Sequence, residues 1–388
     1  MVAMLRLPIY LDYHATTPVD RRVLEQMLPF FTDRFGNPAS SNHSFGWQAQ
    51  EAVEQARRDV AALIGATARE IVFTSGATES NNLAVRGVAE LAAPDRRRIV
   101  VSAIEHKSVL EAAKRLERDG WSMTIVRVDR TGRLDLDGLR AAVTPDTALV
   151  SVMIANNEIG VIQPIAEVCA IAHAAGALFH TDAAQAAGKI PIDVAALDLD
   201  LLSLTAHKMY GPKGCGALFC RKRTSVAPLI CGGGQERGIR SGTLNVPGIV
   251  GLGAACAIAR REMADESARL RQLRDRLLAG LRAHIDGVTV NGSLEHRLPH
   301  NLHVSFDGVD AESLVIGIGD IAVSTGSACS SASATPSHVL RAIHDGDAAS
   351  AASIRFGLGR FTTGEDIDYT IEKFATVVRH LHANTPAR

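Results

Sequence analysis

ALVSVMIANNEIGVIQPIAEVCAIAHAAGALFHTDA, residues 148–183, decides the fold class. It opens with the apolar, β-branched run ALVSVMIA and closes with a second such run, ALFHTDA, both of strand length and composition. Between them, PIAEVCAIAHAAG carries apolar residues at helical spacing. A strand, a helix and a second strand in this order predict parallel strands with a helix packed on their sheet.

The alternation extends from about residue 50 to residue 235. Further runs of strand type are EIVFTS, RIVVSA, MTIVRV and DLLSLTA, and helical segments such as ESNNLAVRGVAEL lie between them. This pattern predicts an α/β fold with a mostly parallel sheet covered on both faces. After Pro247 the chain is expected to be helical to about Ile285 and to leave the first domain along this helix.

The last hundred residues have a different pattern. NLHVSF, IAVS and SIRFGL are typical of strands, and TTGEDIDYTIEKFATVVRHL of a helix that begins with a capping box of Thr362 and Glu365. These elements predict a smaller α+β unit. We therefore expect a large domain over residues 15–262 and a small domain made of residues 1–14 and 263–388.

Composition is that of a globular enzyme. Of 388 residues, 46% are hydrophobic and 21% charged, and the formal net charge is -1. This balance indicates neither direct nucleic-acid binding nor membrane binding. No signal peptide is recognisable and no apolar run approaches the roughly 18 residues of a membrane span, so a cytoplasmic location is expected. The six cysteines form no CxxC pair and no zinc-ligand spacing, which predicts free thiols and no metal site.

Polar residues follow the predicted strands, where ligands bind in open α/β sheets. Gly76, Ala77 and Thr78 could cradle a phosphate or simply begin a capped helix. His106 could bind a ligand, cap a helix or pack. Asn156 and Asn157 could bind a ligand or close a turn.

Three further segments contain residues that could bind a ligand, and two of these residue sets could instead have a purely structural or solvated role. Asp182 ends an apolar strand, where it could face a bound cation or cap the next helix. Lys208 follows another strand and precedes a glycine-proline turn, a setting that would lower its pKa and suit it to form a Schiff base. Arg237 and Arg240 lie among glycines and could bind an anion or remain solvated.

Taken together, these residues indicate one ligand, pyridoxal 5'-phosphate. The lysine would bind the cofactor covalently, the aspartate would keep its ring nitrogen protonated, and the histidine would stack on its face. A nicotinamide dinucleotide is disfavoured because its glycine fingerprint is missing.

From LDYHATTPVD to SIRFGLGRFTT, nearly the whole chain resembles the cysteine desulfurases of the iron-sulfur-assembly and nitrogen-fixation type. The resemblance is carried by FGNPAS, SGATES, EHK, NNEIG, HTDAAQ, HKMYGPKG, GGGQERGIRSGT, GSACSSAS and SIRFGLGR. It implies a class V aminotransferase-type enzyme of pyridoxal-phosphate fold type I, the fold of aspartate aminotransferase. The implied reaction converts L-cysteine to L-alanine and leaves a persulfide on the enzyme, which an acceptor protein of iron-sulfur assembly or tRNA thiolation would receive.

The resemblance also implies residue roles. Lys208 would bind the cofactor, Asp182 its pyridine nitrogen, and Gln185 and Asn157 its phenolic oxygen or the substrate. His106 would stack on the ring and move protons, and Arg355 would bind the substrate carboxylate. The phosphate would lie among Ala77, Thr78, Thr205 and His207, with Thr243 of a neighbouring subunit reaching it in a homodimer.

Cys329 is the expected nucleophile. It stands in STGSACSSASATPS, residues 324–337, where small side chains are expected to let the thiol move between a buried cofactor and an outside acceptor. Four other cysteines fit core positions: Cys169 and Cys256 on helices, and Cys215 and Cys220 on either side of a strand. Cys231, before a triple glycine, is the one rival.

Some residues depart from the family pattern. Ala206 and His14 are not expected to affect catalysis, whereas Ala183 and Ala184 lack a threonine that would supply a supporting hydrogen bond. The chain stops at RHLHANTPAR, without the longer tail on which related enzymes dock their scaffold. The alternatives are another reaction of the same family, such as aminotransfer or selenocysteine lysis, and a non-enzymatic thiol sensor.

Overall fold

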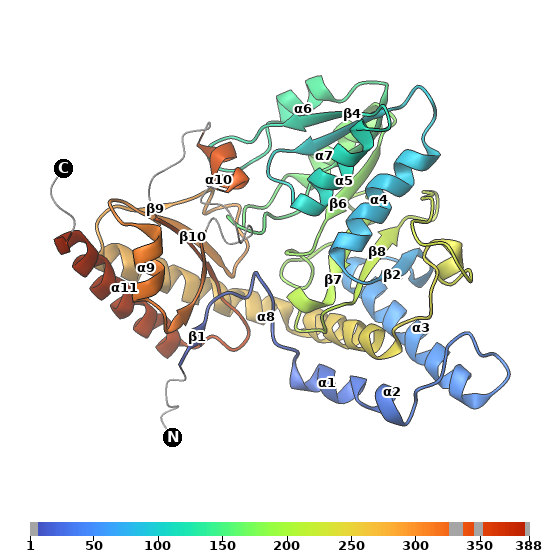
Figure 1. The fold of residues 1–388 in the computed structure, drawn as a ribbon, viewed down its shortest axis with the longest axis horizontal. Coiled ribbons are helices and arrows are strands. Elements are labelled where there is room, and N and C mark those ends of the chain that lie inside the picture. The colour runs from blue at the N-terminus through green and yellow to red at the C-terminus, as the bar shows by residue number, and fades with distance from the viewer. Residues whose placement is uncertain (1–6, 326–336, 345–351, 385–388) are drawn as a thin grey trace.

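The computed structural model describes residues 7–325, 337–344 and 352–384. Its largest sheet has seven strands in the spatial order β2, β8, β7, β6, β5, β3, β4, and all neighbours are parallel except those of β8 (Figure 1). The strand bounds are Ile71–Thr74 (β2), Arg98–Ser102 (β3), Ser122–Val126 (β4), Thr147–Ser151 (β5), Leu178–Asp182 (β6), Leu201–Thr205 (β7) and Gly216–Cys220 (β8). The mostly parallel α/β sheet is thus confirmed, and so is the strand between Cys215 and Cys220, which is β8 and pairs antiparallel with both of its neighbours.

Helices cover both faces of this sheet because successive strand side chains point in opposite directions. In β3, Ile99 and Val101 pack with helices α4 and α5, whereas Val100 packs in the opposite core with α3, α7 and the first part of α8. The helix bounds in this unit are Arg21–Met27 (α1), Pro29–Thr32 (α2), Ser44–Ile64 (α3), Ala77–Leu91 (α4), Lys107–Glu117 (α5), Leu136–Ala142 (α6) and Ile165–Ala174 (α7).

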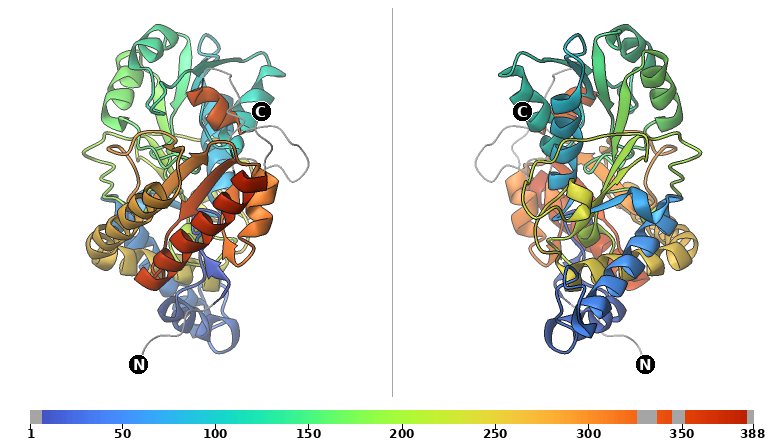
Figure 2. Two further views of the ribbon diagram at one scale, coloured as in Figure 1. Left: turned by 90° about the vertical axis from the view of Figure 1, so that its left-hand side faces the viewer. Right: turned by 90° about the vertical axis from the view of Figure 1, so that its right-hand side faces the viewer.

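Helix α8, Val246–His284, links two hydrophobic cores (Figures 1 and 2). Ile249, Leu252 and Cys256 near its start belong to the core of the large sheet. Leu270, Leu277 and Leu281 near its end belong to a second core. The predicted helix after Pro247 is confirmed, and at roughly 1.5 Å per residue it is long enough to serve both cores.

The second core lies under a four-stranded antiparallel sheet in the order β12, β13, β10, β9, with a separate parallel pair β1 and β11. The bounds are Ile9–Tyr10 (β1), Val288–Val290 (β9), Asn301–Phe306 (β10), Ile321–Ala322 (β11), Ser324–Thr325 (β12), Ala352–Gly357 (β13), Ala311–Gly317 (α9), His338–Ile343 (α10) and Gly364–Asn384 (α11). Val339 and Ile343 of α10 pack in the first core. The domain boundary at residue 262 stays a prediction, which the two cores support.

The capping box of α11 was predicted one residue too early. The Thr363 N–H donates to Asp366 Oδ2 at 2.8 Å, and the Asp366 N–H donates to Thr363 Oγ1 at 3.1 Å. Thr362 instead accepts the Gly359 N–H and is buried. Two consecutive threonines with acidic residues three positions on cannot be told apart from sequence, because both fit the pattern.

Candidate active site

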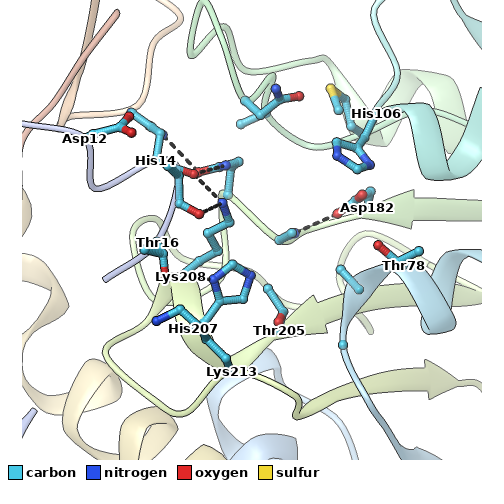
Figure 3. A pocket seen from close by; sticks show the side chains of 18 of the residues that line it. Asp12, His14, Thr16, Thr78, His106, Asp182, Thr205, His207, Lys208 and Lys213 are labelled. Atoms are coloured by element: carbon cyan, nitrogen blue, oxygen red, sulfur yellow. Dashed lines mark hydrogen bonds between the residues drawn. The ribbon is translucent and has the colours of Figure 1, made fainter. Parts of the chain in front are cut away.

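A cavity of about 830 Å³ opens where the central strands of the large sheet end. The N-terminal segment and the small unit close its other sides through Asp12, Ser324 and Arg355. The predicted site residues that line it are Ala77, Thr78, His106, Asn157, Asp182, Gln185, Thr205, His207, Lys208 and Arg355 (Figure 3). Thr243 is exposed and does not line the cavity, and Cys329 lies outside the described residues.

Lys208 ends the short turn Ala206–Lys208 that follows β7. Its Nζ donates to the carbonyl oxygens of His14 and Ala15, the second at 2.6 Å. The side chain is half-buried and points into the cavity (Figure 3). The N-terminal segment thus holds the amine in the cavity by backbone carbonyls.

Asp182, the last residue of β6, is 5% exposed. Its Oδ2 accepts from Asn81 Nδ2 at 2.7 Å, and its Oδ1 from the Ala184 N–H at 2.8 Å. No helix follows before β7, so the helix-cap alternative is wrong. Both donors are neutral, so this buried carboxylate would gain from a cationic ligand.

His106 serves two purposes. Its Nδ1 accepts the Ser108 N–H at 3.2 Å and caps α5, so the capping alternative is correct, and its ring also lines the cavity (Figure 3). Limited hydration lowers the pKa of His106, although the ring faces the open cavity, and the Asp182 charge opposes this effect. Because Nδ1 is an acceptor, the neutral ring carries its hydrogen on Nε2.

The start of α4 forms an anion cradle. Gly76 precedes the helix, and no side chain caps it, so the capped-helix alternative is wrong. A Cβ on Gly216 would lie 2.6 Å from the Gly76 Cα, which shows how closely β8 approaches this turn. Thr78, Thr205 and His207 line the cavity beside it (Figure 3). Free N–H groups, the helix dipole and hydroxyls together suit a phosphate.

His207 contributes no fixed charge to this cradle. Burial, reinforced by Lys208 and Lys213, lowers the pKa of His207 to about 4. Its Nδ1 lies 3.1 Å from Thr16 Oγ1, which ties the ring to the N-terminal segment. At neutral pH the imidazole is therefore a neutral hydrogen-bonding group.

Arg355 projects from β13 and is 6% exposed. Its Nη1 donates to the Asn157 carbonyl, and its Nη2 to Asp12 Oδ1 and Ser324 Oγ, all at 2.8 Å. Within the described part of the chain its buried Nε has no hydrogen-bond partner. A guanidinium that is fixed by these bonds and lines the cavity suits a carboxylate ligand, which its Nη groups could bind in exchange for Asp12 and Ser324.

Of the two roles considered for Asn156 and Asn157, one residue closes the turn and the other faces the cavity. Asn156 Oδ1 accepts the N–H groups of Glu158 and Ile159 and closes the turn. Asn157 lines the cavity. Both alternatives therefore hold, each for one residue.

Sequence reasoning missed Glu105, which is fully buried beside His106. Its Oε1 accepts from the Met153 N–H and from Ser102 Oγ, both at 2.8 Å, while Oε2 has no partner among the described residues. Burial raises the pKa of Glu105 to about 8. The only signal was a charged residue next to an apolar strand, which is ordinary in sequences.

His14 was expected to be unimportant, yet it contacts two predicted site residues. Its carbonyl accepts from Lys208 Nζ and from Gln185 Nε2, and its ring bonds Gln185 Oε1. Asp12 was also overlooked, although it pairs with Arg355. These contacts join residues far apart in sequence, so no local pattern could reveal them.

Four thiols are unsuited to nucleophilic attack. Burial raises the pKa of Cys169 and of Cys215 to about 12 and that of Cys220 to about 11, and it also raises that of Cys256. These thiols are protonated at neutral pH, and thiolates are the nucleophiles. Cys231 is exposed but does not line the cavity.

Both arginines of the glycine-rich segment around residues 232–242 make contacts within the chain. Arg240 pairs with Glu79, with Nε 2.8 Å from Oε1, and Arg237 donates to the Ile71 carbonyl at 2.9 Å. The suggested anion at Arg240 is thus a carboxylate of the protein itself. Arg240 is half-buried in this pair, so the solvated alternative is wrong for it, whereas Arg237 is exposed and the solvated alternative holds there beside its one hydrogen bond.

The cavity's groups fit pyridoxal 5'-phosphate. A lysine amine, a buried carboxylate without a cationic partner among the described residues, and an uncapped helix start correspond to an aldehyde, a pyridine nitrogen and a phosphate. The cradle depends on glycine at 216, where a Cβ would collide with the Gly76 backbone, and at 76, where φ is +150°.

Comparisons with known proteins identify a family of enzymes to which this chain is similar over nearly its whole length. The aminotransferase class-V family matches residues 9–370. The chain is 56% identical over 384 residues to the cysteine desulfurase IscS of Anaeromyxobacter sp. (strain K), which covers 98% of this chain and 95% of that protein. A solved NifS-like protein superposes with a TM-score of 0.90 at 40% identity, covering 96% of this chain and 100% of that one. A structure described as SspA in complex with cysteine has a TM-score of 0.81 at 37% identity, covering 92% and 100%.

Proposed function

The chain belongs to the class V aminotransferase family, and on this basis we propose that it is a cysteine desulfurase that uses pyridoxal 5'-phosphate. The observation that carries the proposal is one cavity holding Lys208, Asp182, His106 and Arg355, in a chain similar over nearly its whole length to cysteine desulfurases. The substrate is L-cysteine, and the products are L-alanine and a protein persulfide.

The chain's own residues would bind and orient the cofactor. Lys208 would bind it covalently, Asp182 would face its ring nitrogen, and Thr78, Thr205 and His207 would surround its phosphate. When bound, the cofactor supplies an electron sink that lets bonds at the substrate's α-carbon ionise. Asn157 and Gln185 would hydrogen-bond the ring oxygen or the substrate.

Arg355 and His106 would act on the substrate. Arg355 binds its carboxylate through donors now shared with Asp12 and Ser324. His106 can present the hydrogen on Nε2 to a group in the cavity, since its Nδ1 is held by Ser108. The lowered pKa of His106 favours the neutral ring at neutral pH.

Cys329 would receive the sulfur. Its thiolate attacks the sulfur of bound cysteine, a sulfur–sulfur bond forms, and the carbon–sulfur bond of the substrate breaks. The electron pair of that bond stays on carbon, which gains a proton and leaves as alanine. Support comes from the other thiols: four are buried with raised pKa values, and exposed Cys231 is absent from the cavity lining.

A homodimer would complete the site with Thr243 from the neighbouring subunit. Thr243 is exposed on this chain and absent from its own cavity, as a residue acting on a partner must be. The exposed aromatics of residues 31–47 offer an apolar surface, where Phe35 is 66% and Trp47 56% exposed. Sedimentation of the purified protein should show the mass of a dimer.

The sulfur acceptor is proposed to be a protein of iron-sulfur assembly or tRNA thiolation, in the cytoplasm. No helix in the described ranges is both long and apolar enough to cross a membrane. Incubation of the holoenzyme with purified acceptor candidates and cysteine would identify the protein that removes the persulfide.

The test of the function is joint measurement of alanine and sulfide from cysteine and dithiothreitol. Equal amounts of both products are expected from the wild-type protein, and neither from Lys208→Ala. Neither product from a wild-type protein that carries the cofactor would refute the proposal. Full alanine formation by Cys329→Ala would favour another reaction of the same family.

A further inference from the structure

A buried chain of polar side chains runs from the small unit to the cavity. Arg297 Nη1 donates to Asn301 Oδ1 at 2.8 Å, and Asn301 Nδ2 lies 3.1 Å from His14 Nε2. His14 Nδ1 lies 2.9 Å from Gln185 Oε1. All four side chains are buried, and Gln185 lines the cavity.

The donors and acceptors along this chain can be assigned from one end. Arginine has only donors, so Asn301 presents its oxygen to Arg297 and its amide nitrogen to His14. A second bond agrees, because Asn301 Nδ2 also lies 3.0 Å from the Glu158 carbonyl, which can only accept. His14 Nε2 is therefore an acceptor.

The assignment continues to Gln185. Burial, reinforced by Arg355, holds the pKa of His14 well below its usual range, so the ring is neutral and its hydrogen lies on Nδ1. That hydrogen is donated to Gln185 Oε1, and one N–H of Gln185 Nε2 is donated to the His14 carbonyl at 3.0 Å. No residue in the described ranges is seen to accept the other N–H of Nε2, which is left for a ligand in the cavity.

We propose that Arg297, Asn301 and His14 are positioning residues that fix the amide of Gln185 so that it presents a hydrogen-bond donor, and not its oxygen, to the ligand in the cavity. This inference rests on the proposed function, in which the ligand is pyridoxal 5'-phosphate with an oxygen on its ring. A reversed amide would place an oxygen against that oxygen and repel it.

Arg297 supports the proposal because it is a buried cation that both holds the preceding loop and donates to Asn301. In the described part of the chain its acceptors are uncharged: the carbonyls of Ser293 and Asn291 and the amide of Asn301. Burial lowers the pKa of Arg297 to about 9. Burying a cation without a carboxylate partner lowers the stability of the fold. Because arginine has only donors, Arg297 determines which atom of Asn301 accepts and therefore in which direction the hydrogen bonds run toward Gln185.

The test compares three variants with the wild-type protein. His14→Leu removes both ring hydrogen bonds, and His14→Asn keeps an N–H close to the position of Nδ1. His300→Phe is the matched control, because His300 stacks on His14 with ring centroids 4.4 Å apart and makes no bond to Gln185. The readouts are the dissociation constant of pyridoxal 5'-phosphate from each apoprotein and the position of the visible absorbance band.

We expect His14→Leu to weaken cofactor binding by about three- to tenfold, the worth of one neutral hydrogen bond, and to shift the absorbance band. His14→Asn should restore most of both, and His300→Phe should change neither even if it lowers the melting temperature. Asn301→Ala, which acts from outside the cavity, should shift the band in the same direction as His14→Leu and serves if that variant fails to fold.

Unchanged binding and absorbance in His14→Leu or in Asn301→Ala would overturn the proposal. Equal effects of His14→Leu and His300→Phe would also overturn it, since packing alone would explain them. A wild-type protein that binds no pyridoxal 5'-phosphate would instead refute the proposed function.

Discussion

Glu105→Gln should change how stability depends on pH. The wild-type carboxyl is fully buried and has two hydrogen bonds to one oxygen, and burial, opposed by these bonds and reinforced by Asp182, raises its pKa from 4.5 to about 8. Glutamine has nearly the same shape and cannot ionise. The variant therefore removes one titration and little else.

The sign follows from proton binding. Between pH 4.5 and about 8, folded Glu105 keeps a proton that the unfolded chain has released. The free energy of unfolding therefore falls as pH rises through this window and is flat above it. At about 1.4 kcal/mol per pH unit, the loss between about pH 6 and about pH 8.5 is roughly 2–3 kcal/mol.

Urea unfolding of both proteins at these two pH values isolates the effect, because all other groups titrate equally in each. The wild-type protein should lose about 2–3 kcal/mol more than Glu105→Gln on going to the higher pH. Equal losses would refute the assignment of a protonated Glu105 in the folded state.

Three further outcomes are expected. Arg355→Lys should raise the KM for cysteine about tenfold or more with a smaller change in kcat, because an ammonium cannot reproduce the planar guanidinium contacts, and an unchanged KM would remove Arg355 from substrate binding. Glu236→Gln should lower the free energy of unfolding by about 1–3 kcal/mol, because it removes the buried carboxylate 2.7 Å from Arg57 and leaves only the half-exposed Glu54, 3.1 Å away; urea unfolding would show no measurable loss if the buried pair were unimportant. Cys231→Ala should leave sulfide release unchanged, whereas Cys329→Ala should abolish it; the reverse result would exchange their roles.

Local patterns in the sequence were sufficient to predict most of the helices and strands. The strands with continuous β-branched runs and the long helix after Pro247 lie where they were predicted, because their hydrophobic spacing matches one secondary structure only. Strand β8, Gly216–Cys220, was expected from its sequence, but its antiparallel direction and its place between β2 and β7 were not, because pairing depends on segments far apart in the chain.

The site was predictable to the extent that parallel strands end at one edge. Asp182 ends its strand, and Asn157 and Lys208 follow theirs, so topology alone brings the three residues together. His14 and Asn301 could not be predicted, since their hydrogen bonds span 171 and 287 positions in the chain. The Asp182 motif shows the same limit: the Ala184 backbone N–H supplies a bond to the carboxylate where a threonine was expected.

The central claim is that sulfur passes from cysteine to Cys329, and mass spectrometry tests it directly. The holoenzyme is given one equivalent of cysteine without reductant, blocked with an alkylating agent and digested. One additional sulfur atom on the peptide that contains Cys329, with an equal amount of alanine in solution, is the predicted result. Additional sulfur on Cys231, or alanine formed with no persulfide on any cysteine, would contradict it.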